Sequence, residues 1–561
     1  MIIGLDVGGT HADVVLLGSN GPVRALKVPT DPSNLFDTVL TGLEKITEGF
    51  EPERISRIVL STTLTTNAII QKKFSRAGMI VASGPGIDPE FFRTNSQYYP
   101  VSGSIDHRGR EIDPIDPTEI EGIVTKLKKQ EVRYVGVVCK FSVRNPKHEL
   151  RINKILEDAF EKVFLGHQIS GNLNFPRRIA TTFFNASVYP IHKKFFEAVK
   201  KSLEKKGLTV PIHILKADGG TMSFESSIDF PGQTILSGPA ASVMGSIAFA
   251  PENEETLVLD IGGTTTDMAI LIHQVPLLNP SGIQLGNFKT LIRSLETHSI
   301  GLGGDSAVRL ENGKLKVGPD RLGHAMAFGG PVPTPTDALC ALGIMEIGDR
   351  EKSIKGIDPI ARKLGTSIED AATRIFDLTC KKILREARKM INRINSKPVY
   401  TVHELLEGYQ VKPERILVLG GPAPYFAKHL EKVSDYKVSV VPGWETANAM
   451  GTALARTTCE VTLFADTEQG IATAPEENYS ERINKSFSKE DAVRKAYALL
   501  EKKALEKGAD PDDLELEVLE EMQFNMVRGF YTAGRNIRIR AQVKPGLIHG
   551  FLPVAEWFPS D

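Results

Sequence analysis

The chain has 561 residues, and its 68 lysines and arginines nearly balance its 69 aspartates and glutamates. This length exceeds what one hydrophobic core usually supports, and the balanced charge excludes a long-range field that would attract nucleic acid or anionic lipid. The expected partners are therefore small molecules and proteins, with no nucleic acid and no membrane.

The cysteines and the hydropathy predict a cytoplasmic protein. Cys139, Cys340, Cys380 and Cys459 lie far apart and form no C-x-x-C pair, which favours reduced thiols. No apolar run approaches the ~18 residues that a membrane-spanning helix needs, and the first residues enter a strand rather than a signal sequence. We therefore expect a cytoplasmic location.

Alternating apolar residues at the N-terminus predict a small antiparallel sheet with glycines at its reversals. Helical and strand patterns then alternate up to residue 161, which predicts an α/β sheet with covering helices. The main elements expected in this half are strands at 2–7, 12–17, 23–29, 55–60 and 212–215 and helices at 34–47 and 191–206.

The second half of the chain repeats the opening plan. A strand at 256–260, a glycine turn and a strand at 267–272 follow the same order as residues 2–17. This repeat predicts an α/β protein with two similar lobes and a small C-terminal α+β subdomain, whose hairpin is expected to turn near residues 533–534. The expected divisions are 1–245 for the N-terminal lobe, 246–465 for the C-terminal lobe and 466–561 for the terminal subdomain.

In each repeat, a strand ends in an aspartate and a Gly-Gly-Thr turn follows. Such a turn exposes backbone N–H groups where no Cβ blocks a phosphate, so two opposed turns can clamp one triphosphate. The aspartates then stand where a Mg²⁺ ion can bridge them to the phosphates through its waters. A single such turn also fits an ordinary hairpin, but two copies favour ATP and Mg²⁺. The candidates are Asp6 and Asp260 for the metal, and Gly8, Gly9, Thr10, Gly262, Gly263, Thr264 and Thr265 for the phosphates.

Further glycine-rich turns follow later in the sequence. Gly420, Gly421 and Pro422 come after a strand expected at 416–419, and this composition lets backbone approach an adenine and a ribose closely. Gly303 and Gly304 form another corner that is able to touch phosphate or ribose. The ordered turns resemble the phosphate-1, phosphate-2 and adenosine motifs shared by actin, sugar kinases and heat-shock chaperones. This resemblance implies a two-lobed, actin-like (ribonuclease H-like) ATPase fold.

Segments between these turns resemble signature segments of the hydantoinase A/oxoprolinase family, in order from residue 1 to about 465. They are STTLTTNA at 61–68, KADGG at 216–220, LSGPAA at 236–241, LDIGGTTTD at 259–267, GLGGDS at 301–306, TPTDA at 334–338 and GGPA at 420–423. The resemblance implies ATP-dependent opening of a cyclic amide, as in 5-oxoprolinase and N-methylhydantoinase. ATP-dependent ketone carboxylation, as in the acetone carboxylase branch, is the alternative within the family.

Both chemistries follow one physical logic. Transfer of the γ-phosphoryl group to an unreactive carbonyl oxygen converts that oxygen into a leaving group. The expected activity is that of an ATP-dependent hydrolase acting on cyclic amide C–N bonds, with a small amide or carbonyl compound as substrate. The resemblance also implies a hydantoinase B-type partner subunit, and an oligomer is expected. A small-molecule kinase and a regulatory ATPase without small-molecule turnover stay open as other functions.

Asp218, Thr63 and Asn67 are the candidate catalytic residues. Asp218 follows an apolar strand, and its placement is similar to that of the acid that orients the acceptor in actin-fold sugar kinases. It would act as a general base, or else only cap the turn that follows it. Thr63 and Asn67 lie at a strand-to-helix junction, where they can reach a substrate carbonyl or phosphate, or simply cap the helix.

Overall fold

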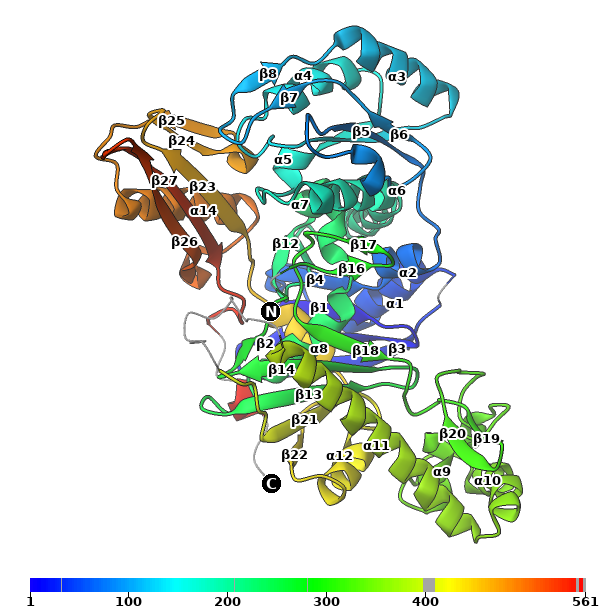
Figure 1. Cartoon of the computed structure of the whole chain (residues 1–561). Coiled ribbons are helices and arrows are strands. Elements are labelled where there is room, and N and C mark those ends of the chain that lie inside the picture. The colour runs from blue at the N-terminus through cyan, green and yellow to red at the C-terminus, as the bar shows by residue number, and fades with distance from the viewer. Residues whose placement is uncertain (32, 206, 280, 397–408, 551–553, 558–561) are drawn as a thin grey trace.

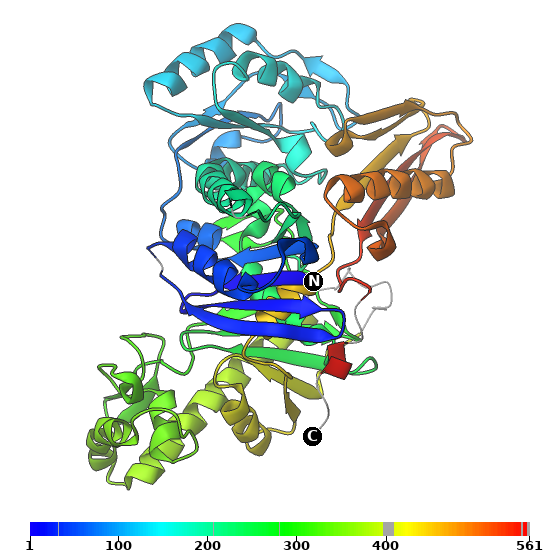
Figure 2. The same ribbon diagram turned by 180° about the vertical axis from the view of Figure 1, so that it is seen from behind.

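The computed structural model describes the whole chain except residues 32, 206, 280, 397–408, 551–553 and 558–561. A pair of sheets lies at the centre of the molecule, with an inserted domain on one side and a helical region on the other (Figure 1). A terminal subdomain lies beside the inserted domain. Figure 2 shows the same arrangement from behind, with the terminal subdomain in orange and red far from the yellow-green helical region.

The first central sheet is built around β1 (Ile2–Val7), which is buried along its whole length. Its neighbour β2 runs antiparallel on one side, and β4 runs parallel on the other. Because β1 is buried on both faces, its sequence is apolar apart from Asp6 near its end. The sheet order is β12 (Thr221–Ser223), β11 (Ile212–Leu215), β4 (Arg57–Thr62), β1, β2 (His11–Gly18) and β3 (Gly21–Pro29).

The second central sheet repeats this arrangement. β13 pairs antiparallel with β14 and parallel with β21, as β1 does with β2 and β4. The register is also the same, because Asp6 pairs with Asp13 and Asp260 with Asp267. The two-lobed actin-like fold predicted from the sequence is therefore confirmed. The sheet contains β15 (Val275–Pro276), β14 (Thr266–Ile272), β13 (Glu255–Ile261), β21 (Arg415–Leu419) and β22 (Lys437–Val440), with β18 (Thr297–Ile300) beside β14.

Helix α1 (Leu35–Thr47) covers the first sheet and begins where the sequence predicts, because the Asn34 side chain accepts from the Asp37 N–H. The long helix α6 (Phe175–Lys205) differs from the helix expected at 191–206. It continues through Pro190, a residue that usually interrupts helices. Residues 178–189 are all buried, so the first half of α6 has no polar face and shows no helical period.

The inserted domain lies between β4 and β11 in the sequence. Its parallel sheet has the order β10 (Lys162–Leu165), β9 (Tyr134–Cys139), β5 (Ala77–Ala82) and β6 (Tyr98–Pro100). The remaining elements are α2 (Leu64–Ile70), β7 (Ser104–Ile105), β8 (Glu111–Asp113), α3 (Pro117–Lys129), α4 (Lys147–Leu156), α5 (Gly166–Ile169) and, after β12, α7 (Phe224–Asp229). The helices α3 and α4 pack on this sheet around a separate hydrophobic core.

The second lobe carries the helical region. Its elements are β16 (Gln284–Leu285), β17 (Phe288–Lys289), β19 (Val308–Glu311), β20 (Lys314–Val317), α9 (Pro335–Ala341), α10 (Arg350–Leu364), α11 (Ile368–Asn395) and α12 (Ala423–Lys432). The apolar faces of β19, β20 and the four helices form one core with β13 and β21, whereas Leu285 of β16 and Phe288 of β17 pack into the core shared by α6 and the inserted domain. None of the helices described is long and apolar enough to cross a membrane.

The terminal subdomain is an antiparallel sheet packed on one long helix, α14 (Lys489–Glu506). Its strands are β25 (Tyr479–Arg482), β24 (Ile471–Ala474), β23 (Glu460–Asp466), β27 (Tyr531–Val543) and β26 (Leu516–Arg528). β23 pairs with β27, so this sheet begins before the division expected at 466. The hairpin turns at Gly529 and Phe530, not near residue 533, because Gly534 lies within β27 where a side chain would meet Glu468.

Helices α8 (Ser237–Ile247) and α13 (Ala447–Leu454) share one hydrophobic core with the facing sides of both central sheets. Their backbones touch, because a Cβ on Gly245 would overlap the Ala447 carbonyl oxygen and a Cβ on Gly451 would overlap the Gly245 nitrogen. Gly4 of β1 is restricted in the same way by Ala449. The lobes therefore meet at small residues, and the contact leaves no room for a side chain at these three glycines.

We predict that Gly245→Ala lowers the free energy of unfolding by about 1–3 kcal/mol, because the added methyl group forces α8 away from α13. Chemical denaturation measures this loss. Gly122→Ala is the matched control, since Gly122 lies in the exposed face of α3 with open space around it. The control should be neutral or stabilise by up to about 1 kcal/mol. Equal effects at both glycines would contradict the account of the α8–α13 contact.

Candidate functional site

The strand ends at Asp6 and Asp260 face each other through α8 and α13. Asn448 of α13 donates to Asp260 Oδ2 at 3.2 Å, and the same side chain interacts with Asp6. Ser242 of α8 donates to Asp260 Oδ2 at 2.5 Å. Asp6 Oδ1 is buried and has no hydrogen-bond partner among the described residues. The two strand ends thus form one polar centre between the lobes.

This centre is rich in buried carboxylates. Burial, with the charges of Asp13 and Asp260, raises the pKa of Asp6 to about 7. Burial and the charge of Asp260 likewise raise the pKa of Asp267 to about 7. Lys27 contacts Asp13 at 2.6 Å, but the carboxylates still repel one another. A cation bound among them would favour their ionised forms.

The donor set fits Mg²⁺ that is held largely through water and phosphate. Carboxylate oxygens are the ligands this ion prefers, and it usually keeps several of its waters. Among the described residues, no group of three or more histidine, cysteine, aspartate or glutamate side chains is arranged to hold a metal ion directly. Asp6 and Asp260 are therefore suited to an ion that also takes ligands from a bound nucleotide.

The glycine turns that follow these aspartates share one geometry. Gly8 N–H donates to the His11 carbonyl at 3.0 Å, and Gly262 N–H donates to the Thr265 carbonyl at 2.9 Å. Apart from the neighbouring residues of the turn, no atom of the described residues lies within 4 Å of the position that a Cβ would take at Gly9. The turns are thus closed by equivalent hydrogen bonds, and the tip of the first one opens into free space.

The later glycines pack around the second turn. Gly304 N–H donates to the Gly262 carbonyl at 2.9 Å, and Gly303 N–H donates to Ser306 Oγ at 2.9 Å. These amides are used within the protein, so this corner supports the turn from behind. Gly420 has a φ of +96°, and a Cβ there would overlap the Ile261 carbonyl oxygen, so only glycine fits.

The rest of the late turn faces open space. Apart from its chain neighbours, no atom of the described residues lies within 4 Å of the position that a Cβ would take at Gly421. Pro422, the next residue, precedes α12. Pro422 also lies close to Gly304, because a Cβ on that glycine would be 3.9 Å from the proline ring. The three glycine-rich segments of the second lobe therefore converge at one place.

Arg321 is a residue of this region that no sequence motif indicated. Its guanidinium contacts Asp305 Oδ2 at 3.1 Å. The Asp305 N–H donates to the Gly263 carbonyl at 2.7 Å, and a Cβ on Gly263 would lie 2.8 Å from Asp305 Oδ2. A positive charge is thus held next to the second glycine turn.

Thr63 and Asn67 belong to the same lobe as the first turn, where Thr63 lies between β4 and α2 and Asn67 lies in α2. The Asn67 side-chain amide donates to Thr63 Oγ1 at 3.2 Å, and Thr63 makes no side-chain capping bond to α2. Ser237 Oγ, at the start of α8, donates to the carbonyl of Thr62 at 3.3 Å. The junction is therefore fastened to α8, and the Thr63 hydroxyl is held by an amide rather than used as a helix cap.

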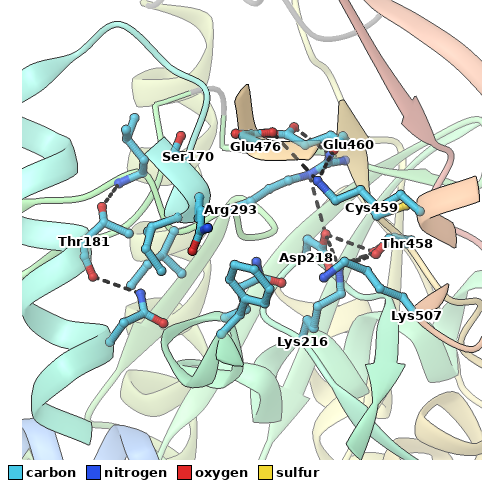
Figure 3. A pocket seen from close by; sticks show the side chains of 18 residues that line it. Ser170, Thr181, Lys216, Asp218, Arg293, Thr458, Cys459, Glu460, Glu476 and Lys507 are labelled. Carbon is cyan, nitrogen blue, oxygen red and sulfur yellow. Dashed lines mark hydrogen bonds and ion pairs between the residues drawn. The ribbon is translucent and has the colours of Figure 1, made fainter. Parts of the chain in front are cut away.

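Asp218 lies elsewhere, in a cavity of about 70 Å³ between the first lobe and the terminal subdomain (Figure 3). Lys216 Nζ donates to Asp218 Oδ2 at 3.1 Å, and Gly220 N–H donates to Oδ1 at 3.0 Å. Thr458 Oγ1 lies 3.1 Å from Oδ2. Burial would raise the pKa of Asp218, but the charges of Lys216 and Arg293 outweigh it and hold this pKa below its usual value.

The terminal subdomain supplies much of the cavity wall. Glu460 of β23 contacts Arg293 at 3.1 Å and Arg540 at 2.8 Å. Burial opposes its ionisation, but these two arginines lower the pKa of Glu460 to about 2. The other residues it contributes are Thr458, Cys459, Glu476, Lys503 and Lys507. These positions fall in three separate stretches, at 458–460, at 476 and at 503–507, that form no motif, so sequence reasoning missed them as site residues.

Helix α8 connects the cavity with the glycine turns. None of the described residues that line the cavity belongs to a glycine turn. However, a Cβ on Gly219 would lie 2.7 Å from Met244 Sδ, and Ser242, two residues earlier on α8, donates to Asp260. The structure therefore groups Asp6, Asp260 and the turns in one centre and places Asp218 in a second one that contacts the same helix.

Sequence profiles of known families match most of the chain. The Hydantoinase/oxoprolinase N-terminal region matches residues 2–160, and Hydantoinase/oxoprolinase matches residues 178–461. The second match ends at the start of β23, so the terminal subdomain lies almost wholly outside it.

Curated relatives include the caprolactamase subunit alpha of Pseudomonas jessenii, which is 25% identical over 78% of this chain and 68% of its own length. The acetophenone carboxylase gamma subunit of Aromatoleum aromaticum is 23% identical over 81% of this chain and 67% of its own. The 5-oxoprolinase 1 of Arabidopsis thaliana is 25% identical over 75% of this chain, but the chain spans only 38% of that protein.

Solved structures with the same fold include the ATP-dependent caprolactamase from Pseudomonas jessenii, with a TM-score of 0.72 and 20% identity over 98% of this chain and 88% of that one. Nucleotide-free acetone carboxylase has a TM-score of 0.69 and 18% identity over 99% of this chain and 88% of that one. The likeness extends through the terminal subdomain. The two profile matches agree with the paired turns and with the signature segments between them. The chain therefore belongs to the hydantoinase/oxoprolinase family.

Proposed function

We propose that this protein is the nucleotide-binding component of an ATP-dependent enzyme that activates a cyclic amide, or a related carbonyl compound, by phosphoryl transfer. The observation that carries the proposal is the pair of Asp-x-Gly-Gly-Thr turns, which have the same register and meet at one buried polar centre. Caprolactamase and 5-oxoprolinase among the relatives support a cyclic amide as the substrate.

In this proposal, Mg-ATP binds between the lobes at the centre formed by Asp6 and Asp260. Mg²⁺ would supply the positive charge that neutralises the phosphates and the buried aspartates. The Arg321 guanidinium lies where it can add charge beside the second turn. The remaining contacts are assigned to Gly8, Gly9, Thr10, Gly262, Gly263, Thr264 and Thr265 for the phosphates and to Gly420, Gly421 and Pro422 for the adenosine, with Gly303 and Gly304 supporting the second turn.

On the substrate side, we assign Thr63 and Asn67 to the phosphoryl-transfer region and Asp218 to the cavity. A general base works best with a pKa near the working pH, and the pKa of Asp218 is lowered by Lys216 and Arg293. Asp218 is therefore better suited to orient these cations and to accept a hydrogen bond from a substrate than to remove a proton.

We also propose that a B-type subunit completes the reaction. The caprolactamase, acetophenone carboxylase and acetone carboxylase relatives are each named as a subunit. In such an assembly, this chain would use ATP to phosphorylate and so activate the substrate, and the partner would supply the rest of the hydrolytic site.

We predict lactam-dependent phosphate release when the purified chain, with and without a B-type subunit, is given Mg-ATP and a panel of lactams. Asp260→Asn should lower this rate by about 100-fold or more, because it removes charge at the phosphate centre. Asp370→Asn, an exposed aspartate in the first turn of α11, is the matched control and should keep the rate.

Parallel reactions with a ketone and bicarbonate, and with sugars, cover the carboxylase and kinase alternatives. Phosphate release that no lactam stimulates, together with stimulation by a ketone plus bicarbonate, would replace hydrolysis by carboxylation. Turnover that none of these compounds stimulates would contradict the proposed enzyme.

We predict that Lys216→Met costs about 3–5 kcal/mol of unfolding free energy, because it leaves the buried, ionised Asp218 short of its main partner. Adding Asp218→Asn should recover part of the loss, since a neutral amide replaces the charge. Lys200→Met, which removes a lysine paired with Glu225 at the surface, should change stability by no more than about 1 kcal/mol. A double variant as unstable as the sum of both single variants would refute the coupling. Denaturant titration measures the free energy of unfolding of the wild-type protein, Lys216→Met, Asp218→Asn, the double variant and Lys200→Met.

A further inference from the structure

Lys507 is a buried cation of the Asp218 cavity that has no anionic partner among the described residues. It directly follows α14, lines the cavity and is 8% exposed. Among the described residues, its ammonium group makes no hydrogen bond and no ion pair; its contact is with the face of the Phe230 ring, 4.3 Å from the ring centre. Figure 3 shows it on the same side of the cavity as Thr458 and Lys216.

The other cations of this cavity are paired. Lys216 contacts Asp218 at 3.1 Å, and Arg293 contacts Glu460 at 3.1 Å. Lys503 forms an ion pair with Glu477 and lies 3.8 Å from Glu476. Lys503 and Lys507 are one helical turn apart. The ammonium group of Lys503 is neutralised by carboxylates, whereas that of Lys507 has no such partner among the described residues.

An aromatic face compensates only part of the loss of water around a buried ammonium. Burial, together with repulsion by Lys503 and Lys216, lowers the pKa of Lys507 to about 8. Below that pH, the group is mostly charged and its field is directed to the cavity. Buried charges that reduce stability in this way are typical of binding sites, where a ligand supplies the missing counter-charge. The other titratable groups around it are Lys503, Lys216, Cys459, Glu477, Glu476, Asp218, Arg293 and Glu460.

We propose that Lys507 binds a small carboxylate-type anion in this cavity: the carboxylate of a substituted lactam substrate or, if the enzyme carboxylates a ketone, bicarbonate. The cavity of about 70 Å³ has room for several water-sized groups, which suits such an anion. The identity of the anion rests on the proposed function. Its recognition rests on Lys507 itself.

Part of this site, including Lys507 itself, lies outside the residues that the family profile covers. Glu476, Lys503 and Lys507 all follow residue 461, where the profile match ends. The terminal subdomain therefore adds these three charged groups to those that Lys216, Asp218 and Arg293 supply to the cavity wall. In this proposal, anion recognition depends on the terminal subdomain through Lys507 and not on the glycine turns.

The test measures ligand binding to the full chain by calorimetry without ATP. The probes are 5-oxoproline, which carries a carboxylate, caprolactam, which is neutral, and bicarbonate. At least one of the anions should bind the wild-type protein at least tenfold more tightly than Lys507→Met, and Lys507→Arg should restore most of the affinity. Caprolactam should bind the wild-type and Lys507→Met proteins equally. Preference for 5-oxoproline identifies a substrate carboxylate, and preference for bicarbonate identifies the carboxylation reaction.

Two further readouts separate recognition from a structural role. Anion affinity in the wild-type protein should fall as the pH rises above about 8, since Lys507 then loses its charge, whereas the Lys507→Arg variant should keep its affinity. Without ligand, Lys507→Met should raise the melting temperature, while Lys503→Met, which breaks an ion pair, should lower it. Equal anion binding by wild type and Lys507→Met, or a melting temperature lowered by both substitutions, would overturn the proposal. Because no ATP is present, failure of lactam-dependent phosphate release leaves this result unaffected.

Discussion

The contact between α8 and α13 is the constraint on which the rest of the structure depends. Their backbones touch through Gly245 and Gly451, so the two central sheets are held at a fixed separation. From this position, Ser242 and Asn448 reach Asp260 from opposite helices. A wider separation would break both hydrogen bonds, and the buried aspartates would lose their alignment between the lobes.

The two polar centres of the protein have opposite imbalances of charge. Between the glycine turns, mutually repelling carboxylates exceed the cations near them, and Asp6 Oδ1 has no partner among the described residues. In the cavity around Asp218, Lys507 is a charged group that has no anionic partner in the part of the chain that the structure describes. Each imbalance costs stability that a bound ligand would restore: the Mg²⁺ of a Mg-nucleotide would balance the carboxylates of the first centre, and a carboxylate would balance Lys507 in the second. Helix α8 touches both centres and so connects them.

The sequence predicted those features that depend on local chemistry. The Asp-x-Gly-Gly-Thr turns repeat within a few residues of a strand, so both the fold and the centre between the lobes could be inferred. The start of α6 could not, because its buried first half has no amphipathic period and contains Pro190. Lys507 and Glu460 were missed for another reason: only tertiary packing of the terminal subdomain brings them to Asp218, and an isolated lysine at a helix end normally indicates a solvated surface.

The most direct test of the paired-turn site is calorimetric titration of ATP, with and without Mg²⁺, into the wild-type protein and into Asp6→Asn and Asp260→Asn. We expect Mg²⁺ to tighten ATP binding strongly in the wild-type protein, because it neutralises both the phosphates and the buried carboxylates. Each substitution should remove most of this gain and leave metal-free binding nearly unchanged. ATP affinity that is independent of Mg²⁺, or a Mg²⁺ effect that survives both substitutions, would contradict the account.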